Sequence, residues 1–387
     1  MARLAVLSRR PFGVRLSRDR GWGWRHVLYY GAPIWAFLLA GVVVSLLLLL
    51  SHIGIGTAYS ALYQGALGNR YNVGLSLTEA VPLVFTGLAV GFAYRCGLFN
   101  IGAEGQLQVA GLTAAVIGVK SGSALAAILG GLAAGAIWSG VPGYARARFG
   151  VNEVISTLML NFVAITFVII IVSGPFADPQ ATYPTSPAVP NSAQLPTILS
   201  GTPLHLGFVI ALCVAVLVFW ILYRTPLGFR IRAVGMNAEA AKHAGIKVSE
   251  TITAAMIVSG ALAGLGGAIE VLGVEHRVAT DWSPGWGFTG IAVAFLARTN
   301  PVATFVVALL YGGLEAGAQN MQLVTGVPGA AISIIEGLPI LFLIAILSKT
   351  RPAVRGGLRR EQLAESGPVP KTGPGGGEVL PVEGVQP

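Results

Sequence analysis

Long apolar runs dominate the chain and are separated by short polar or charged breaks. Cutting the sequence at charges, Pro/Gly clusters and polar stretches predicts ten segments, at 33–53, 74–94, 98–119, 124–142, 151–173, 207–223, 251–272, 286–297, 301–319 and 328–348. Most are long enough to cross the roughly 30 Å hydrocarbon core of a bilayer as helices. The eighth is too short to span alone and is expected to be broken or re-entrant. The pattern predicts an all-α, polytopic membrane helical bundle of about ten transmembrane segments.

Composition supports a membrane protein and argues against a nucleic-acid partner. Hydrophobic residues make up 54% of the chain and charged residues 11%, while 25 Lys and Arg outnumber 16 Asp and Glu. Much of the positive charge lies between or beyond the apolar runs, where it indicates topology rather than nucleic-acid binding. The two cysteines, Cys96 and Cys213, show no pairing or metal-binding spacing and are expected to be free thiols.

Positive residues alternate between dense and sparse loops, which predicts the orientation of the chain. The first 32 residues contain seven arginines, and 224–250 and the start of the C-terminal tail are also basic, whereas 174–206 has no Lys or Arg. Because cytoplasmic loops retain positive charge, both termini are expected to be cytoplasmic after an even number of crossings.

Four regions follow from this reading. Residues 1–32 are a basic cytoplasmic or interfacial arm, too long and arginine-rich for an ordinary signal peptide, and 33–348 form the transmembrane domain. Within it, 224–250 is a cytoplasmic loop. The Pro/Gly-rich residues 349–387 cannot bury a core and are expected to be a disordered cytoplasmic tail.

Two predicted segments carry polar residues at a spacing of four. In the third segment these are Asn100, Glu104 and Gln108, and in the fifth they are Glu153, Thr157 and Asn161. This spacing places each set on one helix face, and two such faces could line a path for a polar solute. Interhelical hydrogen bonding is the alternative for Asn100 and Glu104, since intramembrane polar residues also join helices. A salt bridge at the cytoplasmic rim, with Arg146 or Arg148, is favoured for Glu153.

Small residues at GxxxG spacing predict close helix packing rather than a substrate site. The pairs are Gly87 and Gly91, Gly131 and Gly135, Gly260 and Gly264, and Gly313 and Gly317.

The chain lacks sequence signatures of catalysis. It has no GxxxxGK[ST] phosphate loop, its five histidines are dispersed, and no nucleophile–base or metal-ligand set is visible. We therefore predict that it is not an enzyme, hydrolyses no ATP by a Walker mechanism, and holds no metal or cofactor.

The basic loop 224–250 is a candidate docking element for a soluble partner. Asn237 can cap a short helix, and Ala240 and Ala241 give that helix a small face able to pack in a groove. A solvated amphipathic loop is the alternative.

Four motifs in order resemble one family. They are GLFNIGAEGQ at 97–106, VNEVISTLMLN at 151–161, TPLGFRIRAVGMNAEAAKHAGIKV at 225–248 and SGALAGLGGAIE at 259–270. They look like permease subunits of bacterial ABC importers for nucleosides and simple sugars, a group related to the ribose and branched-chain amino-acid permeases. The resemblance covers roughly residues 33–348.

The resemblance implies a transport subunit in the bacterial inner membrane. Its expected partners are a cytoplasmic ATPase that binds ATP-Mg, a second permease subunit and an extracytoplasmic or lipid-anchored binding protein. It further implies two inverted repeats, here segments two to five and seven to ten, which suits alternating access. The residues matching the family's ATPase-coupling region are Gly235, Asn237, Ala240, Ala241 and Gly245.

The resemblance favours nucleosides as substrate, because VNEVISTLMLN is more similar to nucleoside-type members than to the branched-chain amino-acid branch. Simple sugars are the alternative. An ion-coupled secondary transporter is the alternative from another class, with Glu104 as its candidate ion or proton site.

Overall fold

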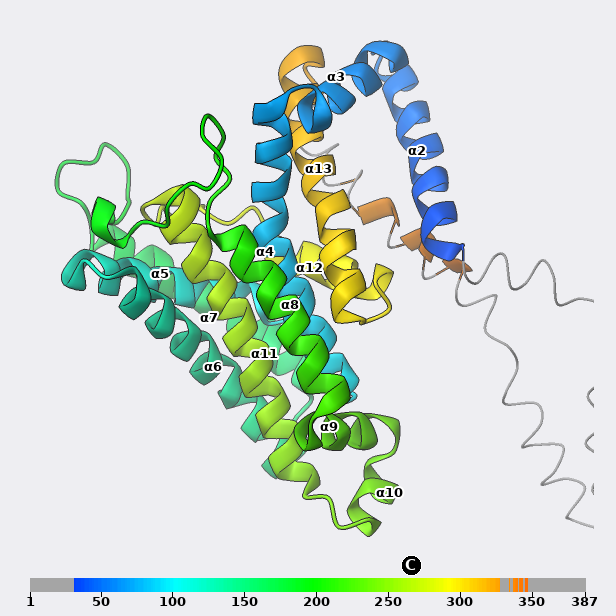
Figure 1. The fold of residues 1–387 in the computed structure, drawn as a ribbon, viewed down its shortest axis with the longest axis vertical. Coiled ribbons are helices and arrows are strands. Elements are labelled where there is room, and N and C mark those ends of the chain that lie inside the picture. The colour runs from blue at the N-terminus through cyan, green and yellow to red at the C-terminus, as the bar shows by residue number, and fades with distance from the viewer. Residues whose placement is uncertain (1–30, 328–333, 335–336, 340, 344, 347–387) are drawn as a thin grey trace, which may run out of the picture.

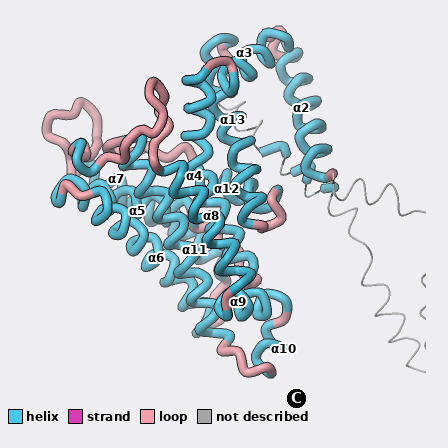
Figure 2. The backbone as a smooth tube through the Cα atoms, in the orientation of Figure 1, coloured by secondary structure: helices cyan, strands magenta, loops and turns pink. Residues whose placement is uncertain are grey.

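A computed structural model describes residues 31–327, 334, 337–339, 341–343 and 345–346, and it is built from helices (Figures 1 and 2). The helices are α2 (Ala32–Leu50), α3 (Ile55–Leu67), α4 (Arg70–Arg95), α5 (Ala103–Ser121), α6 (Ala124–Phe149), α7 (Glu153–Ser173), η1 (Asn191–Ala193), α8 (Gly207–Arg224), α9 (Pro226–Met236), α10 (Ala238–His243), α11 (Val248–Glu270), η2 (Val271–Glu275), α12 (Trp286–Leu296) and α13 (Pro301–Thr325). Among the described residues, extended pairing is limited to two isolated bridges, Thr185–Ala279 and Thr197–His205. The predicted helical membrane bundle is confirmed.

Six helices are long and apolar enough to cross a membrane, namely α4, α6, α7, α8, α11 with its η2 extension, and α13. Most of α4 and α11 is buried, whereas less than a third of the residues in the apolar stretches of α6, α7 and α8 are buried. Hydrophobic side chains on the outer helices can face lipid at no hydration cost, so this arrangement suits a protein embedded in a bilayer.

Helix starts follow local capping chemistry. The side chains that accept a hydrogen bond from a first-turn backbone N–H are Asn69, Ser123, Asn152, Thr225, Asn237 and Asn300. Each satisfies a donor that the helix itself cannot pair.

Several segment boundaries differ from the predicted ones: α5 begins at Ala103 rather than residue 98, and α6 continues to Phe149 rather than residue 142. The pattern missed α3, a 13-residue helix between α2 and α4, because its polar positions resemble a connecting loop. The ninth segment extends to Thr325 rather than residue 319, where the left-handed Gly326 ends it. The predicted tenth segment, 328–348, lies mostly outside the described residues, as do the arm up to residue 30 and the tail.

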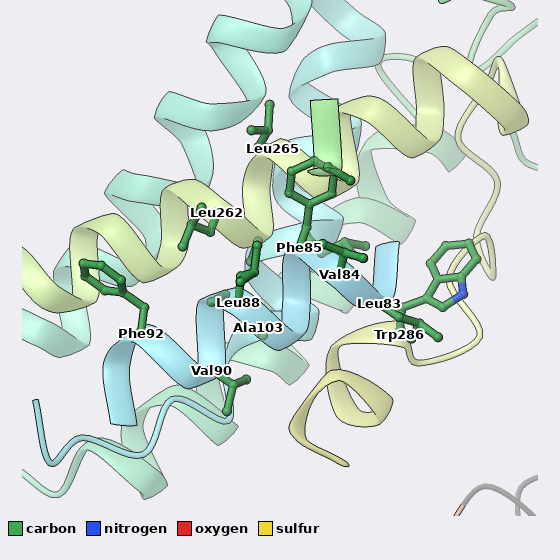
Figure 3. Close-up of a cluster of buried hydrophobic side chains, with 14 of the residues drawn as sticks. Leu83, Val84, Phe85, Leu88, Val90, Phe92, Ala103, Leu262, Leu265 and Trp286 are labelled. Atoms are coloured by element: carbon green, nitrogen blue, oxygen red, sulfur yellow. The ribbon is translucent and has the colours of Figure 1, made fainter. Parts of the chain in front are cut away.

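The close packing of α6 on α11 confirms the role predicted for their glycines. A Cβ on Gly135 would overlap the Gly260 carbonyl, and one on Gly264 would lie 2.6 Å from the Gly131 carbonyl oxygen. The two GxxxG faces therefore meet each other directly, which only small residues permit. Figure 3 shows the neighbouring apolar contact, where Phe85 and Leu88 of α4 lie beside Leu262 and Leu265 of α11.

The long segment 174–206 covers one end of the bundle, here called the loop end (Figure 2). Backbone hydrogen bonds tie it to the chain after α11, from Ser186 N to Val278 O at 2.8 Å and from Val189 N to His276 O at 2.7 Å. His205, at its close, is buried, and its Nδ1 accepts a hydrogen bond from Gly207 N at 3.1 Å. Helices α9 and α10 occupy the opposite end, here called the α10 end (Figure 1).

The eighth predicted segment is confirmed as a short helix. After His276 the chain runs back into the bundle and begins α12 only at Trp286, whose carbonyl oxygen accepts a hydrogen bond from Thr86 Oγ1 at 3.1 Å. With 11 residues, α12 is about 16 Å long, roughly half a membrane crossing. Its first turn thus lies inside the protein, packed on α4 and α5.

Candidate functional site

The third segment does not begin as a helix. Helix α4 ends at Arg95, and Gly97, two residues further on, has φ +78°. Leu98 N then donates back to Ala93 O at 3.2 Å. Residues 98–102 are non-helical, and α5 starts at Ala103. The single helical face predicted for Asn100, Glu104 and Gln108 is therefore wrong for Asn100, because the left-handed glycine directs the chain away from helical geometry before that residue.

Asn100 joins the non-helical stretch to two helices. Its amide exchanges two hydrogen bonds with the Gln106 amide, both 3.0 Å long, and its Nδ2 also donates to Ser259 Oγ on α11 at 2.8 Å. Its Oδ1 accepts from Gly102 N at 3.0 Å. Asn100 is fully buried, so these bonds satisfy an amide that would otherwise be costly to bury.

Glu104 and Gln108 do share a face of α5, and Glu104 links α5 to α12. Gln108 Nε2 donates to Glu104 Oε1 at 2.8 Å, and Ser283 Oγ donates to the same oxygen at 2.7 Å. The other carboxylate oxygen accepts from Gly287 N at 2.8 Å. Gly287 lies in the first turn of α12, so the carboxylate occupies a helix N-terminus, where the helix dipole favours negative charge.

The polar face predicted for the fifth segment is confirmed on α7. Glu153, Thr157 and Asn161 are all buried on that helix. Asn161 Oδ1 accepts from Gly105 N at 2.9 Å, and its Nδ2 donates to Ile101 O at 2.9 Å, so it holds the start of α5. The predicted rim salt bridge is also present, with Arg146 Nε 3.2 Å from Glu153 Oε2.

The five predicted pathway residues are all buried, and four of them make three separate sets of hydrogen bonds, here together called the network. Asn100 bonds to Gln106 and Ser259, Glu104 to Gln108, Ser283 and Gly287, and Asn161 to Gly105 and Ile101. Thr157 Oγ1 bonds only to carbonyl groups of α7.

The exposed fractions of the five residues are 0% for Asn100, 1% for Glu104, 6% for Gln108, 0% for Thr157 and 1% for Asn161. In this conformation the network holds α5 against α7, α11 and α12, so the hydrogen-bonding role accounts for these contacts. A role in substrate passage stays a prediction.

Sequence reasoning missed the partners of Glu104. Ser283 and Gly287 lie about 180 positions further along the chain, in DWSPGWG at 281–287. One signal in the sequence could have found them: the unusually short apolar segment at 286–297 is preceded by residues rich in Pro and Gly. In transporters, this pattern marks discontinuous helices that form binding regions.

At the α10 end, the predicted cap and helix are present. Asn237 Oδ1 accepts from Ala240 N at 3.0 Å, and α10 spans only six residues. Gly245 ends the helix at φ +82°, with hydrogen bonds from Gly245 N to Lys242 O and from Ile246 N to Ala241 O, both 3.0 Å long. This pair of bonds is a Schellman motif, in which a left-handed glycine satisfies the last carbonyls.

Ala240 and Ala241 are both expected from the sequence to face a partner, and this prediction is wrong for Ala241. Ala240 is exposed, but Ala241 is only 4% exposed and belongs to the protein's own hydrophobic core. The Schellman motif turns the chain back after α10, and Ile246 packs against the hydrophobic core to which Ala241 belongs. Gly235 also serves an internal contact, because a Cβ there would overlap the Arg95 carbonyl at the end of α4.

Two hollows flank the chain between α10 and α11. One, of about 430 Å³, has Leu227, Arg230, Gly245 and Glu250 in its lining. The other, of about 470 Å³, lies between the end of α6 and α10, with Ala147, Ala238, Glu239, Lys242 and Ser249 among its lining residues. The surface of the α10 end therefore consists of one short projecting helix and two recesses lined by charged residues. This shape is suited to a protein partner.

Among the described residues, no group of three or more His, Cys, Asp or Glu side chains is arranged to hold a metal ion. Both cysteines are free thiols, with Cys96 buried and Cys213 exposed.

Comparison with known proteins gives consistent matches along most of the chain. Residues 72–346 match the family model described as branched-chain amino acid transport system / permease component. The guanosine ABC transporter permease protein NupP of Bacillus subtilis is 40% identical, over 80% of this chain and 91% of that protein.

Two other relatives differ in the substrate that they are named for. The glucose ABC transporter permease protein TsgB13 of Haloferax volcanii is 32% identical over 89% of this chain and 94% of its own length. The nucleoside ABC transporter permease protein NupB of Lactococcus lactis is 32% identical over 74% and 83%, respectively. No solved structure matches significantly.

Proposed function

The chain belongs to the permease-component family of branched-chain amino acid transport systems, and from this premise we propose that it imports nucleosides. It is a membrane-embedded, non-catalytic subunit of an ATP-binding cassette transporter, and ATP is hydrolysed by a separate subunit. The observation that carries the substrate assignment is the 40% identity to a guanosine permease over most of both chains. The glucose-named relative keeps simple sugars as the second candidate.

The proposed assembly contains this chain, a second permease subunit, a cytoplasmic ATPase with bound ATP-Mg, and an extracytoplasmic substrate-binding protein. The α10 end faces the cytoplasm and the ATPase, and the loop end faces the binding protein. Both termini are cytoplasmic in this scheme, with the protein in the bacterial inner membrane.

Coupling in this proposal runs through α10. The exposed residues around Asn237 and Ala240 dock in the ATPase, while Ala241 packs α10 into the protein's own core and Gly235 of α9 lies against the end of α4. A rigid attachment of this kind transmits movement of the ATPase to the membrane helices. The ATPase switches access because its two nucleotide states bind unequally to the two permease conformations.

The proposed pathway passes the buried residues Asn100, Glu104, Gln108, Thr157 and Asn161. Two non-helical stretches, 98–102 and 277–285, lead into α5 and α12, one from each of the proposed inverted repeats. Hydrogen bonds from Ser283 and Gly287 to Glu104 join the starts of these two helices. Irregular backbone inside a membrane protein is tolerated where it is buried in protein or lines a cavity, and it commonly marks the substrate region of transporters. Relative movement of α5 and α12 would open this region in alternate directions.

Uptake by the reconstituted transporter tests the proposal. Proteoliposomes holding both permeases and the ATPase, with the binding protein outside, are supplied with radiolabelled guanosine or glucose. Guanosine uptake that needs ATP and is abolished by an ATPase-dead partner is the expected result. Preferential glucose uptake would replace the nucleoside assignment with the sugar one, and uptake without the ATPase would contradict the coupling scheme.

A further inference from the structure

Three buried side chains beside the Glu104 network carry polar atoms that have no hydrogen-bond partner. These atoms are Gln108 Oε1, Trp282 Nε1 and Trp286 Nε1. The three residues are 6%, 5% and 5% exposed, respectively. Buried polar groups nearly always form hydrogen bonds in native proteins, so three buried polar atoms without a partner in neighbouring side chains require an explanation.

The three residues form one group, here called the indole–amide cluster. The Trp282 ring lies against Gly111 of α5, where an added Cβ would be 2.6 Å from ring atom Cζ2, and Gly111 is less than one turn beyond Gln108. The two indole rings are 6.0 Å apart between centroids, at 62° to each other.

Glu104 ties the cluster together. Its carboxylate binds Gln108 as well as Ser283 and Gly287, which follow the two tryptophans in sequence. Figure 3 shows the Trp286 side chain beside Leu83, at the edge of the packed apolar side chains of α4 and α11. The cluster therefore lies between α5 and the start of α12.

The chemistry of the cluster matches a nucleobase. It offers two indole faces for stacking, two N–H donors and one amide acceptor, whereas a nucleobase offers a flat aromatic ring whose edges carry both donors and acceptors. A sugar can also pair with the polar atoms and pack a C–H face on an indole, so competition by ribose in the labelling experiment below distinguishes recognition of the base from recognition of the sugar. An apolar solute would leave all three polar atoms unpaired.

We propose that the indole–amide cluster of Gln108, Trp282 and Trp286 is the nucleobase-recognition site of the permeation pathway. This inference rests on the proposed nucleoside import and adds the residues that select for the base. The rings are covered in the present conformation, and separation of α5 from α12 exposes them to the substrate. The base then supplies the missing hydrogen-bond partners, which stabilises the open conformation relative to this one.

Guanosine uptake by the complete transporter in proteoliposomes tests the cluster, with Trp286→Leu and Gln108→Leu as the variants. Loss of base stacking should lower kcat/KM for guanosine at least about fivefold in Trp286→Leu. Trp286→Phe keeps an aromatic face and should recover most of the activity. Trp138→Leu is the matched control, because Trp138 of α6 also has an unpaired Nε1 but stacks on Phe167, outside the cluster.

Photolabelling of the wild-type complex with 8-azidoguanosine gives a second readout that needs no variant. The label is expected within 107–111 or 282–287, and guanosine but not ribose should displace it. Absence of guanosine uptake by the wild type would overturn the proposed function itself. Wild-type uptake with labelling only elsewhere, or with Trp286→Leu equal to Trp138→Leu, would overturn the cluster alone. If the Leu variants fail to assemble, the position of the label in the wild-type complex alone determines whether the cluster binds the base.

Discussion

Glu104 is a buried residue whose side chain joins α5 to α12. Its carboxylate accepts three hydrogen bonds at 2.7–2.8 Å from α5, from Ser283 and from the first turn of α12. Glu104→Leu removes every acceptor, and each buried donor left unpaired costs roughly 1–3 kcal/mol. We expect a clear loss of thermal stability in the purified permease, together with reduced uptake. An unchanged melting temperature with lost uptake would show instead that Glu104 serves passage rather than packing.

Glu104→Gln separates charge from shape at the same position. The amide keeps one acceptor oxygen but turns an NH2 group toward a donor, so a smaller destabilisation than in the Leu variant is expected. Glu250→Gln is the matched control, since Glu250 pairs with Lys247 at the exposed surface and such pairs contribute little. Normal transport by Glu104→Gln at every pH tested would exclude proton coupling through this carboxyl group.

His205 makes stability at the loop end depend on pH. Burial, and secondarily the nearby His276, lowers the pKa of His205 from 6.5 to about 4. As the pH falls, His205 is protonated in the unfolded chain before it is protonated in the folded protein, which favours unfolding. The contribution of neutral His205 to the free energy of unfolding is therefore fully present above about pH 6.5 and is lost as the pH falls toward 4. The difference between the two pKa values corresponds to a loss of about 3 kcal/mol in the free energy of unfolding over that pH range.

Thermal unfolding between pH 7.5 and pH 4.5 measures this effect. His205→Asn keeps an acceptor for Gly207 N but cannot be protonated, so its melting temperature should fall less on acidification than that of the wild type. His243→Asn, at an exposed position of α10, should follow the wild type. An identical acid response in all three proteins would contradict the prediction.

In helix α10, two neighbouring residues have different roles: one belongs to the exposed surface and the other to the protein's core. Ala240 faces outward and Ala241 faces inward, so one bulky substitution has two different effects along a single turn. Ala240→Trp should weaken ATPase copurification and substrate-stimulated hydrolysis while leaving the permease fold intact. Ala241→Trp should overpack the protein's own core, at a typical cost of about 1–3 kcal/mol.

Copurification with the ATPase and the melting temperature of the isolated permease separate the two outcomes. Lys242→Gln is the control for surface change without bulk, because rim charges contribute modestly to affinity. Wild-type coupling in the Ala240→Trp variant would remove this face of α10 from the proposed interface.

For the whole molecule, the two ends of the bundle should lie on opposite sides of the membrane. Single cysteines replacing Thr182 of the loop end and Ala238 of α10, both exposed, report the sides in a background without Cys96 and Cys213. An impermeant maleimide should label only the first in intact cells and only the second in inverted vesicles. Thr185 is unsuitable because it is buried and hydrogen-bonded to Val278 O. Labelling from the same side would contradict the proposed topology.

Local sequence was sufficient to predict much of the architecture. The spans from α4 to α8, the short α12, the Asn237 cap and the GxxxG faces of α6 and α11 all follow from patterns within a few turns. A helix in a membrane must satisfy its backbone hydrogen bonds internally, so length, polarity and capping residues largely determine where each one lies. Helix α3 and the late start of α5 escaped prediction because their polar and glycine-rich sequences suit helix and loop alike.

The candidate site required the packed structure. Glu104 was recognisable as an unusual intramembrane carboxylate, but its partners Ser283 and Gly287 belong to a different part of the chain. Likewise, the spacing of Ala240 and Ala241 could not say which one faces outward, because that depends on how α10 packs on the rest of the protein, and Ala241 is the one that joins the hydrophobic core. Backbone periodicity is a local property, whereas partner choice depends on how helices distant in sequence pack, and that packing placed Glu104 at the first turn of α12.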